Sequence, residues 1–389
     1  MLIAYFGTMS EEDSVMEMRK MEKLGVETSL LGFGCMRLPL KDGKIDRERT
    51  AAMFDTAFQA GINYFDTAFP YHNGESELVV GELLKKYDRN SFYLATKLPL
   101  YRVHSLDDAK ELLNLQLSRL QVDYVDFYLL HALNRNSFRE MVSYGVVDYL
   151  AEMKKEGKIR NFGFSFHDSY EAFEEIINYR DWDFCQIQYN YMDRNDQAGD
   201  RGVALCTEKN IPLIIMEPIK GGTLATLPEE VTSPLRALRP EASVASWALR
   251  FVGSRPIVKV ILSGMSDEAQ LSDNLNTFTG FEPLSEEEAK AVDDTAAAIR
   301  ARVRNSCTGC RYCMPCPNGV DIPKNFSIWN TYGMYANAGH TKWQWEHEIS
   351  ADAKADNCLG CGACESACPQ QMPIIEHLQM LREELNALG

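Results

Sequence analysis

The chain has 389 residues, of which 45% are hydrophobic and 25% charged, a composition typical of a soluble globular protein with two or three domains. Its 40 basic and 56 acidic side chains leave a net charge of −16, which disfavours nucleic acid and an anionic membrane as partners, and no apolar run reaches the roughly 18 residues of a membrane span. Eight of the eleven cysteines lie between Cys307 and Cys368, unlike the dispersed cysteines of a secreted disulfide scaffold. Because the first residues also lack the basic flank of a secretory signal, we expect a cytoplasmic protein.

Three stretches follow one another along the chain. Residues 1–22 are a polar N-terminal extension rich in Met and Glu. In residues 23–300, short apolar runs alternate with amphipathic stretches, which is the pattern of repeated β-strand and α-helix units. Residues 301–389 contain the clustered cysteines and are expected to form a separate ferredoxin-like domain.

The middle stretch predicts eight strands separated by helices. The strands are expected at 30–36, 63–67, 92–97, 125–131, 159–164, 184–189, 213–216 and 258–262. Helices are expected between them, for instance at 46–60, 76–87, 106–120 and 144–156, with Asp46 as an N-cap and Gly61 and Gly157 as C-terminal glycines. Eight such units over about 250 residues indicate an α/β fold of the (β/α)8 TIM barrel type. An open doubly wound sheet is the alternative, but no G-x-G-x-x-G turn follows the first strand.

The last stretch contains two cysteine arrays that repeat one another. The first has the spacing C-x2-C-x2-C-x2-C-P and the second C-x2-C-x2-C-x3-C-P. The second is the spacing of bacterial two-cluster ferredoxins, in which the fourth cysteine ligates the other cluster. One predicted 4Fe–4S cluster is therefore assigned to Cys307, Cys310, Cys313 and Cys368. The other is assigned to Cys358, Cys361, Cys364 and Cys316. The shorter last gap of the first array leaves the crossed position of Cys316 open.

Structural zinc is the alternative to iron and sulfide, because zinc sites also use four cysteines. Such sites typically combine two distant C-x2-C pairs, whereas the first array places four cysteines within ten residues and without histidine. The spacer between the arrays, residues 317–357, is rich in aromatic side chains and predicts helices that pack between domains. The remaining Cys35, Cys185 and Cys206 are expected to be small buried hydrophobic residues.

Four polar side chains lie at or just after the ends of successive predicted strands of the barrel. Asp66 lies at the end of the second strand and Tyr71 follows it, Lys97 ends the third, and His131 ends the fourth. Barrel enzymes keep their active sites at this end of the strands. A nearby ammonium makes a phenol a better proton donor, a carboxylate keeps that ammonium charged, and an imidazole orients a carbonyl oxygen. The set therefore predicts proton delivery to a carbonyl group while hydride arrives at its carbon.

The chain resembles the aldo/keto reductase family over roughly residues 18–280. The resemblance rests on LGFGCMRL at 31–38, NYFDTA at 63–68, ATK at 95–97, DYVDFYLLH at 123–131 and GKIRNFGFS at 157–165. It implies that Asp66, Tyr71, Lys97 and His131 are the catalytic tetrad. With its cysteine arrays, the chain is similar to the iron–sulfur branch of that family, in which a mainly helical, ferredoxin-like domain follows the barrel.

The resemblance also implies a nicotinamide nucleotide and its contacts. Ser165 and Gln186 would hold the carboxamide, Lys220, Gly221 and Gly222 would meet the pyrophosphate, and Asn274 the adenine. Met216 stands where the family usually stacks an aromatic ring on the nicotinamide, and Phe166 replaces the Asn after the serine, with His167 next. Residues 261–274 contain three acidic side chains and no Lys or Arg, which favours NADH over NADPH as cofactor. The missing aromatic ring leaves a flavin open, but no flavin-specific motif is present.

The expected function is therefore that of an iron–sulfur oxidoreductase. It reduces a small-molecule carbonyl, or oxidises the alcohol, with Tyr71 as proton donor. Hydride transfer moves two electrons whereas a 4Fe–4S cluster passes one, so the coupling of the two domains stays open. A ferredoxin- or flavodoxin-type protein is the expected electron partner. The alternative is an electron-transfer or redox-sensing protein whose barrel has lost nicotinamide-dependent chemistry.

Overall fold

The structure, a computed structural model, describes residues 15–388. The chain divides into two compact units, which are described separately. The first contains residues 1–220 and 246–285, and the second contains residues 221–245 and 286–389. Residues 1–14 of the predicted N-terminal extension lie outside the described part of the chain.

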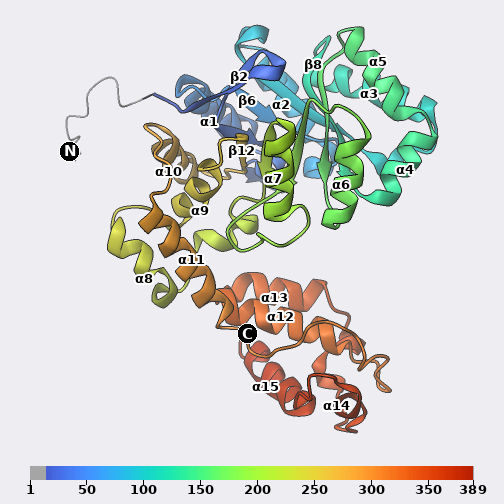
Figure 1. The fold of residues 1–389 in the computed structure, drawn as a ribbon, viewed down its shortest axis with the longest axis vertical. Coiled ribbons are helices and arrows are strands. Elements are labelled where there is room, and N and C mark those ends of the chain that lie inside the picture. The colour runs from blue at the N-terminus through green and yellow to red at the C-terminus, as the bar shows by residue number, and fades with distance from the viewer. Residues whose placement is uncertain (1–14, 389) are drawn as a thin grey trace. The chain divides into compact units, whose positions relative to one another are not determined.

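A closed barrel of eight parallel strands forms the centre of the first unit (Figure 1). In barrel order the strands are β3 (Leu31–Gly34), β6 (Tyr64–Asp66), β7 (Tyr93–Leu98), β8 (Val125–Leu133), β9 (Ile159–Phe166), β10 (Phe184–Gln188), β11 (Leu213–Met216) and β12 (Val258–Ser263). Strand β12 pairs with β3 and closes the circle. The predicted fold class is confirmed, and each of the eight expected strands is present. Because both faces of a parallel strand are covered, these segments appear in the sequence as continuous apolar runs.

Helices follow the strands and cover the outside of the barrel (Figure 1). They are α1 (Arg47–Gln59), α2 (Ser76–Leu84), α3 (Leu106–Leu120), α4 (Arg135–Ser143), α5 (Val146–Lys155), α6 (Tyr170–Tyr179), α7 (Gly199–Lys209), α9 (Val244–Gly253) and α10 (Glu268–Phe278). Asp46 caps α1 as predicted, because its carboxylate accepts a hydrogen bond from the Arg49 amide at 3.1 Å. Gly61 and Gly157 follow α1 and α5 with φ of 95° and 82°, the left-handed conformation expected after a helix.

A short hairpin precedes the barrel and contains part of the predicted N-terminal extension. Strand β1 (Met18–Met21) lies in the extension predicted for residues 1–22, yet it pairs antiparallel with β2 (Val26–Ser29) of the predicted barrel. Met21 is buried against Tyr64, Phe127 and other side chains of the barrel interior. The boundary expected at 22/23 therefore falls inside one hairpin, and Met21 of the predicted extension is buried in the barrel interior. A second small hairpin joins β4 (Leu40–Lys41) and β5 (Lys44–Ile45).

The second unit is built from helices. It contains α8 (Glu229–Leu238), α11 (Glu286–Arg300), α12 (Ile322–Tyr335), α13 (Ala338–His347), α14 (Ala363–Ala367) and α15 (Ile374–Asn386). Arg239 of the α8 end pairs with Glu288 of α11 at 2.6 Å. The observed division thus places residues 221–245 and 286–300 with the C-terminal unit, whereas the sequence suggested a boundary at 300/301.

The aromatic spacer between the cysteine arrays is helical, as expected, and forms α12 and α13. Its Phe326, Trp329 and Trp345 are buried in a core shared with Leu378 and Leu381 of α15. The expectation that these rings pack between domains is wrong, because they form the interior of the second unit itself.

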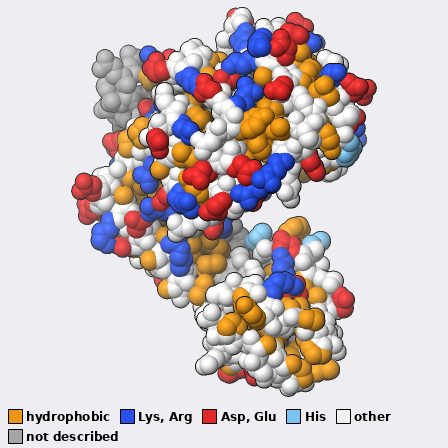
Figure 2. All heavy atoms as spheres, turned by 45° about the vertical axis from the view of Figure 1, so that its right-hand side comes forward, with side chains coloured by type: hydrophobic (Ala, Val, Ile, Leu, Met, Phe, Trp, Pro, Cys, Tyr) orange, Lys and Arg blue, Asp and Glu red, His pale blue; other side chains and the backbone are white. Residues whose placement is uncertain are grey.

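The surface charge of the barrel unit and the hydropathy of the helices also bear on the expectations from the sequence. On the face drawn in Figure 2, acidic and basic side chains are intermixed over the barrel unit, so the net negative charge does not gather there in one patch. Among residues 15–388, no helix is long and apolar enough to cross a membrane.

Candidate active site and cluster sites

The predicted tetrad gathers at the carboxyl ends of three neighbouring strands. Asp66 is the last residue of β6, Lys97 lies near the end of β7, and His131 lies near the end of β8. Tyr71 begins the short helix η4 (Tyr71–Gly74), five residues after Asp66. Because β6, β7 and β8 are adjacent and parallel, these side chains meet at one end of the barrel.

Lys97 is the centre of this group. Its Nζ donates to Asp66 Oδ1 at 2.6 Å, to the Thr67 carbonyl oxygen at 2.8 Å and to Tyr71 Oη at 3.3 Å. The rings of Tyr71 and His131 lie edge to face, with centroids 6.1 Å apart. The structure therefore brings together all four residues predicted as the tetrad.

Burial controls the protonation of the tetrad. Lys97 and Asp66 are only 1% and 2% exposed. Burial alone would lower the pKa of Lys97, but the charges and hydrogen bonds of Asp66 and Tyr71 together outweigh it and the pKa is raised, so the ammonium stays charged. Burial raises the pKa of Asp66, and Lys97 opposes that shift.

The phenol and the imidazole respond differently from the sequence expectation. Burial raises the pKa of Tyr71, and the lowering by Lys97 does not overcome it. Tyr71 is thus a protonated donor. The Lys97 ammonium reduces the upward shift of the Tyr71 pKa but does not reverse it. Burial, followed by Lys97 and His167, lowers the pKa of His131 to about 3. His131 is therefore a neutral imidazole near pH 7, able to donate one hydrogen bond without carrying charge.

Two of the predicted nicotinamide contacts lie side by side. Ser165 of β9 and Gln186 of β10 are register partners in the barrel, and both side chains are buried. The Ser165 hydroxyl accepts a hydrogen bond from the Ala132 amide at 2.8 Å. The Gln186 Oε1 atom is buried and has no hydrogen-bond partner within the described residues. Since a buried amide oxygen without a donor is costly, this pair fits an amide-bearing ligand. Met216 ends the next strand, β11.

The positions predicted for the pyrophosphate and the adenine already have protein partners. Lys220 pairs with the buried Asp193 at 2.6 Å, and this ion pair lowers the pKa of Asp193 although burial alone would raise it. Gly221 and Gly222 follow Lys220 with φ of 65° and 98°, so this turn needs residues without a Cβ atom. Asn274 donates to Ser263 Oγ at 2.8 Å. Lys220 and Asn274, which were predicted to contact the nucleotide, therefore form hydrogen bonds with other residues of the protein.

An arginine that the sequence reasoning missed lies beside the acidic segment. Arg49 of α1 forms a bidentate pair with Glu268 at the start of α10, with Nε donating to Oε1 at 2.8 Å. This contact, together with the backbone amide of Glu268, lowers the pKa of Glu268 to about 2. Asp267 caps the same helix by accepting from the Gln270 amide at 2.8 Å. The absence of Lys and Arg from residues 261–274 was correct, but α1 supplies a guanidinium that Glu268 neutralises.

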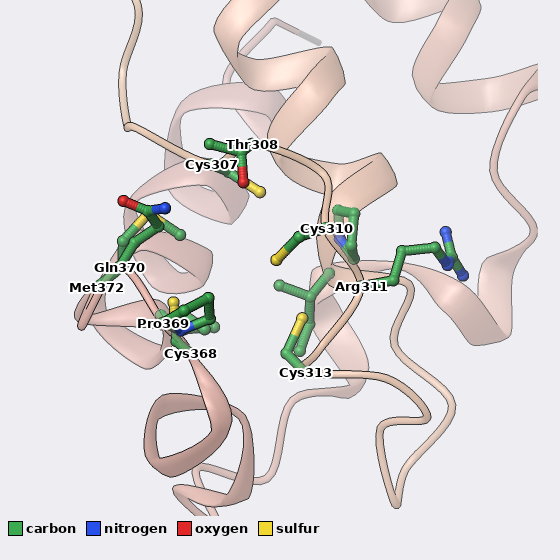
Figure 3. Close-up of a pocket in the computed structure, with 12 residues that line it drawn as sticks. Cys307, Thr308, Cys310, Arg311, Cys313, Cys368, Pro369, Gln370 and Met372 are labelled. Carbon is green, nitrogen blue, oxygen red and sulfur yellow. The ribbon is translucent and has the colours of Figure 1, made fainter.

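The eight clustered cysteines separate into two groups of four around two pockets. The first pocket is lined by Cys307, Cys310, Cys313 and Cys368. Figure 3 shows the sulfur atoms of these four pointing toward one central space, while Arg311 points away from it. The second pocket is lined by Cys316, Cys358, Cys361 and Cys364. The structure thus brings the cysteines together in the crossed grouping expected from the spacing, with Cys316 in the second group despite the shorter gap before it.

Each pocket is lined by four cysteines and by no histidine. Among the described residues, no group of three His, Cys, Asp or Glu side chains is closely enough placed to hold a single metal ion. The other three cysteines, Cys35, Cys185 and Cys206, are buried in the barrel unit as expected.

Comparison with known proteins agrees with both halves of this description. The model of the aldo/keto reductase family matches residues 30–297, which is more than half of the chain. The chain belongs to the aldo/keto reductase family. The model of a 4Fe-4S dicluster domain matches residues 306–372 of this aldo/keto reductase, which spans both cysteine arrays.

Individual relatives resemble the aldo/keto reductase barrel. The chain is 26% identical over 307 residues to an uncharacterized oxidoreductase, YqkF, of Bacillus subtilis, which covers 71% of this chain and 95% of that protein. It is 29% identical over 221 residues to the NADH-specific methylglyoxal reductase of Escherichia coli, covering 52% of this chain and 65% of the relative. Among solved structures, the holo form of aldo-keto reductase AKR11C1 from Bacillus halodurans superposes with a TM-score of 0.61 and 26% identity, covering 72% of this chain and 96% of that one. The chain is thus an oxidoreductase of this family with a C-terminal 4Fe–4S domain.

Proposed function

We propose that the barrel reduces a small-molecule carbonyl, or oxidises the corresponding alcohol, with Tyr71 as the proton donor. The observation that carries this proposal is the hydrogen-bonded chain from Asp66 through Lys97 to Tyr71. A bound nicotinamide supplies the hydride that forms the new C–H bond. Tyr71 gives its proton to the carbonyl oxygen as that oxygen gains negative charge, and Lys97 stabilises the resulting tyrosinate. The neutral His131 donates a hydrogen bond that orients the carbonyl.

The nucleotide is proposed to be NADH. Ser165 and Gln186 would hold the carboxamide, because Gln186 Oε1 is a buried acceptor that can receive the amide hydrogens. Glu268 pairs with the guanidinium of Arg49 and adds a carboxylate to the segment that the family resemblance assigns to the 2′-phosphate of NADPH, where it would repel that group. The Escherichia coli relative is an NADH-specific methylglyoxal reductase, which supports the same preference.

We propose that each group of four cysteines binds one 4Fe–4S cluster. The grouping of four thiols around each of two pockets supports this number. The clusters would exchange single electrons with a small electron-carrier protein of the ferredoxin or flavodoxin type. A cytoplasmic location suits this chemistry, because the reducing environment there protects exposed cysteines such as Cys310 and Cys361.

A second candidate is a redox protein whose barrel no longer uses a nicotinamide. The observation that favours it is the ion pair between Lys220 and Asp193, which occupies the side chain expected at the pyrophosphate. Under this alternative the clusters would be reducible, whereas NADH would neither bind nor support carbonyl reduction.

One anaerobic experiment distinguishes the two candidates. The purified protein is assayed for iron and sulfide, then titrated with NADH while visible absorption of the clusters and reduction of a dicarbonyl such as methylglyoxal are followed. The proposed function requires carbonyl-dependent NADH oxidation that Tyr71→Phe abolishes. Saturating NADH with no binding, no oxidation and no bleaching would instead support the redox protein. Bleaching by NADH without a carbonyl would show that the barrel and the clusters share electrons.

A further inference from the structure

A buried carboxylate outside the tetrad lies behind it. Glu77, on the first turn of α2, has a side chain with no exposed surface. The proton transfer described above does not use this group. A carboxylate withdrawn from water in this way must be paired and hydrogen-bonded, so its partners show what it organises.

Both oxygens of Glu77 are saturated by donors from two other elements. Oε1 accepts from Thr96 Oγ1 at 2.7 Å and from Gln116 Nε2 at 2.6 Å. Oε2 accepts from Arg119 Nε at 2.7 Å. Gln116 and Arg119 are three residues apart on α3 and therefore lie on the same face of that helix.

Gln116 and Arg119, which Glu77 holds in place, also donate hydrogen bonds to backbone carbonyl groups next to the tetrad. Gln116 Nε2 also donates to the carbonyl oxygen of Lys97 at 3.0 Å. The Nη2 atom of Arg119 donates to the carbonyl oxygen of Gly74, which ends the turn that Tyr71 begins. Gln116 Oε1 accepts from the hydroxyl of the buried Tyr128 on β8, the strand that carries His131. One carboxylate thus connects the strand of the catalytic lysine with the turn of the catalytic tyrosine.

The turn that carries Tyr71 needs this support. His72 and Asn73 have φ of 52° and 53°, and Gly74 has φ of 87°. Two consecutive residues with side chains in the left-handed region store strain that only surrounding contacts can hold. Arg119 supplies contacts at both ends of the segment, because its guanidinium also lies over the Phe69 ring at 4.8 Å.

We propose that Glu77 is a positioning residue for the carbonyl reduction: by holding Arg119 and Gln116, it sets the distance between the Tyr71 hydroxyl and the Lys97 ammonium. Glu77 touches neither substrate nor cofactor and acts only through these two side chains. The proposal rests on the proposed function for its kinetic consequence. Its geometric content, the placement of Tyr71 beside Lys97, can be measured without turnover.

The variant Glu77→Gln tests the proposal. A glutamine keeps the shape and one acceptor for Thr96 and Gln116, but its NH2 group faces the Arg119 donor, so Arg119 is released. We expect kcat for carbonyl reduction to fall about ten- to hundredfold, because small misplacements of reacting groups have effects of that size. The KM values for carbonyl and NADH should stay within about twofold, since neither binding site is altered.

A second variant covers the case in which Glu77→Gln folds poorly. Arg119→Lys keeps the charge and the Glu77 pair but lacks the fork that reaches Gly74 at the same time. It should show the same fall in kcat with unchanged KM. The matched control is Glu82→Gln, which removes an exposed carboxylate from the same helix, where Glu82 pairs only with the exposed Arg47 in the described contacts. That control should behave as the unaltered protein.

A readout independent of turnover is the titration of Tyr71 itself. The protein is labelled with 13C-tyrosine, and the Tyr71→Phe variant identifies the signal of Tyr71. NMR then follows the chemical shift of this phenol as a function of pH. The groups around Tyr71, namely Asp66, Lys97, Cys35 and His131, are the same in all the proteins compared. In Glu77→Gln and Arg119→Lys, the pKa of Tyr71 should rise further, because Lys97 is less well placed to stabilise the tyrosinate.

The possible outcomes are distinct. Folded Glu77→Gln and Arg119→Lys proteins with unaltered Tyr71 titration and unaltered kcat would overturn the positioning role. A loss of activity in proportion to the unfolded fraction, with an unaltered Tyr71 titration, would assign Glu77 to stability alone and would also overturn it. If Tyr71→Phe keeps full carbonyl reduction, the proposed function fails, and the NMR titration still decides the role of Glu77.

Discussion

The barrel site and the cysteine pockets hold their reactive groups in different ways. In the barrel, side chains fix one another: Lys97 has three acceptors within 3.3 Å, and the Glu77 network fixes the backbone behind it. In the second unit, the first array from 307 to 316 lies in a segment without helix or strand, ordered by backbone contacts such as the Cys307 amide donating to Asn305 Oδ1 at 3.0 Å. The side chains of the tetrad hold one another in place, whereas we expect the cysteines of the two pockets to be held in place by the clusters that they bind.

The two regions also differ in how their charged groups are compensated. In the barrel, the buried positive charge of Lys97 is compensated by Asp66. In the pockets, burial raises the pKa of Cys313, and burial with nearby Glu365 and Cys358 raises the pKa of Cys364 to about 11. Each neighbouring cysteine adds to the cost of forming a thiolate, a cost that bound iron removes. The comparison predicts that loss of a catalytic side chain spares the fold, whereas loss of a cluster does not.

The largest expected effect is on catalysis in the barrel. Tyr71→Phe removes the donated proton and keeps the ring that packs beside His131. We expect carbonyl reduction to fall about a thousandfold, within the range for loss of a general acid, while the visible absorption of the clusters and the thermal midpoint stay unchanged. Steady-state kinetics and spectra of the same sample measure both. Retention of activity would remove Tyr71 from the mechanism.

The next effect concerns the second unit and the crossed grouping of its cysteines. Cys313→Ala and Cys368→Ala should each remove the same cluster, and Cys316→Ala should remove the other, because the three side chains divide between two pockets in that way. Iron analysis should show about half of the iron lost in each case, and the electron paramagnetic resonance spectrum of the reduced protein identifies which cluster remains.

Loss of either cluster should also destabilise the helices around it. Several cysteines pack against the core that contains Trp329 and Trp345, so we expect a lower midpoint in thermal unfolding and increased exposure of these rings. Thr308→Ala is the control, since Thr308 lines the first pocket but carries no thiol. Equal stability of the apo and loaded proteins would contradict the difference drawn between the two regions.

A smaller effect distinguishes the regions by pH. The pKa of His131 in the folded barrel is about 3, below its ordinary value near 6.5, so folding favours the neutral ring. This contribution is fully present above pH 6.5 and is lost as the pH falls toward 3, by up to about 1.4 kcal/mol per pH unit. Urea unfolding of the barrel at pH 7 and pH 5.5 measures the loss, which His131→Gln should reduce. An equal pH dependence of stability in His131→Gln and in the unaltered protein would contradict this assignment.

The parts of this molecule that the sequence predicted are those with local signals. The barrel strands are apolar runs with clear ends, and Asp66, Lys97 and His131 are recognisable because each stands at or near such an end. The cluster cysteines follow from spacing alone, because a cubane is wrapped by residues close together in the chain.

The parts that the sequence did not predict depend on distant partners. Glu77 looks like an ordinary acidic residue in the first turn of a helix, and only its contacts with Gln116 and Arg119, 39 and 42 residues away, make it a buried network. The ion pair of Lys220 with Asp193 is equally invisible in the linear sequence. Strand β1 has four residues, two of them charged, and gives no apolar run, so the sequence does not separate it from the N-terminal extension and does not predict its pairing with β2.

The smallest expected effect concerns the choice between NADH and NADPH, and it rests on a contact between residues 219 positions apart in the sequence. Glu268 holds Arg49 in a bidentate pair, so this guanidinium beside the acidic segment is neutralised. Glu268→Gln removes that charge and frees Arg49 to meet a 2′-phosphate. Because both side chains are exposed, water screens the pair, and the ratio of kcat/KM for NADPH to that for NADH should rise only about two- to fivefold. Glu48→Gln on α1 makes the same change of charge next to Arg49 without breaking the pair, and it should leave the ratio unaltered. An equal rise in both variants would mean that net charge alone governs the preference, and the contact between α1 and α10 would then have no specific role in reading the nucleotide.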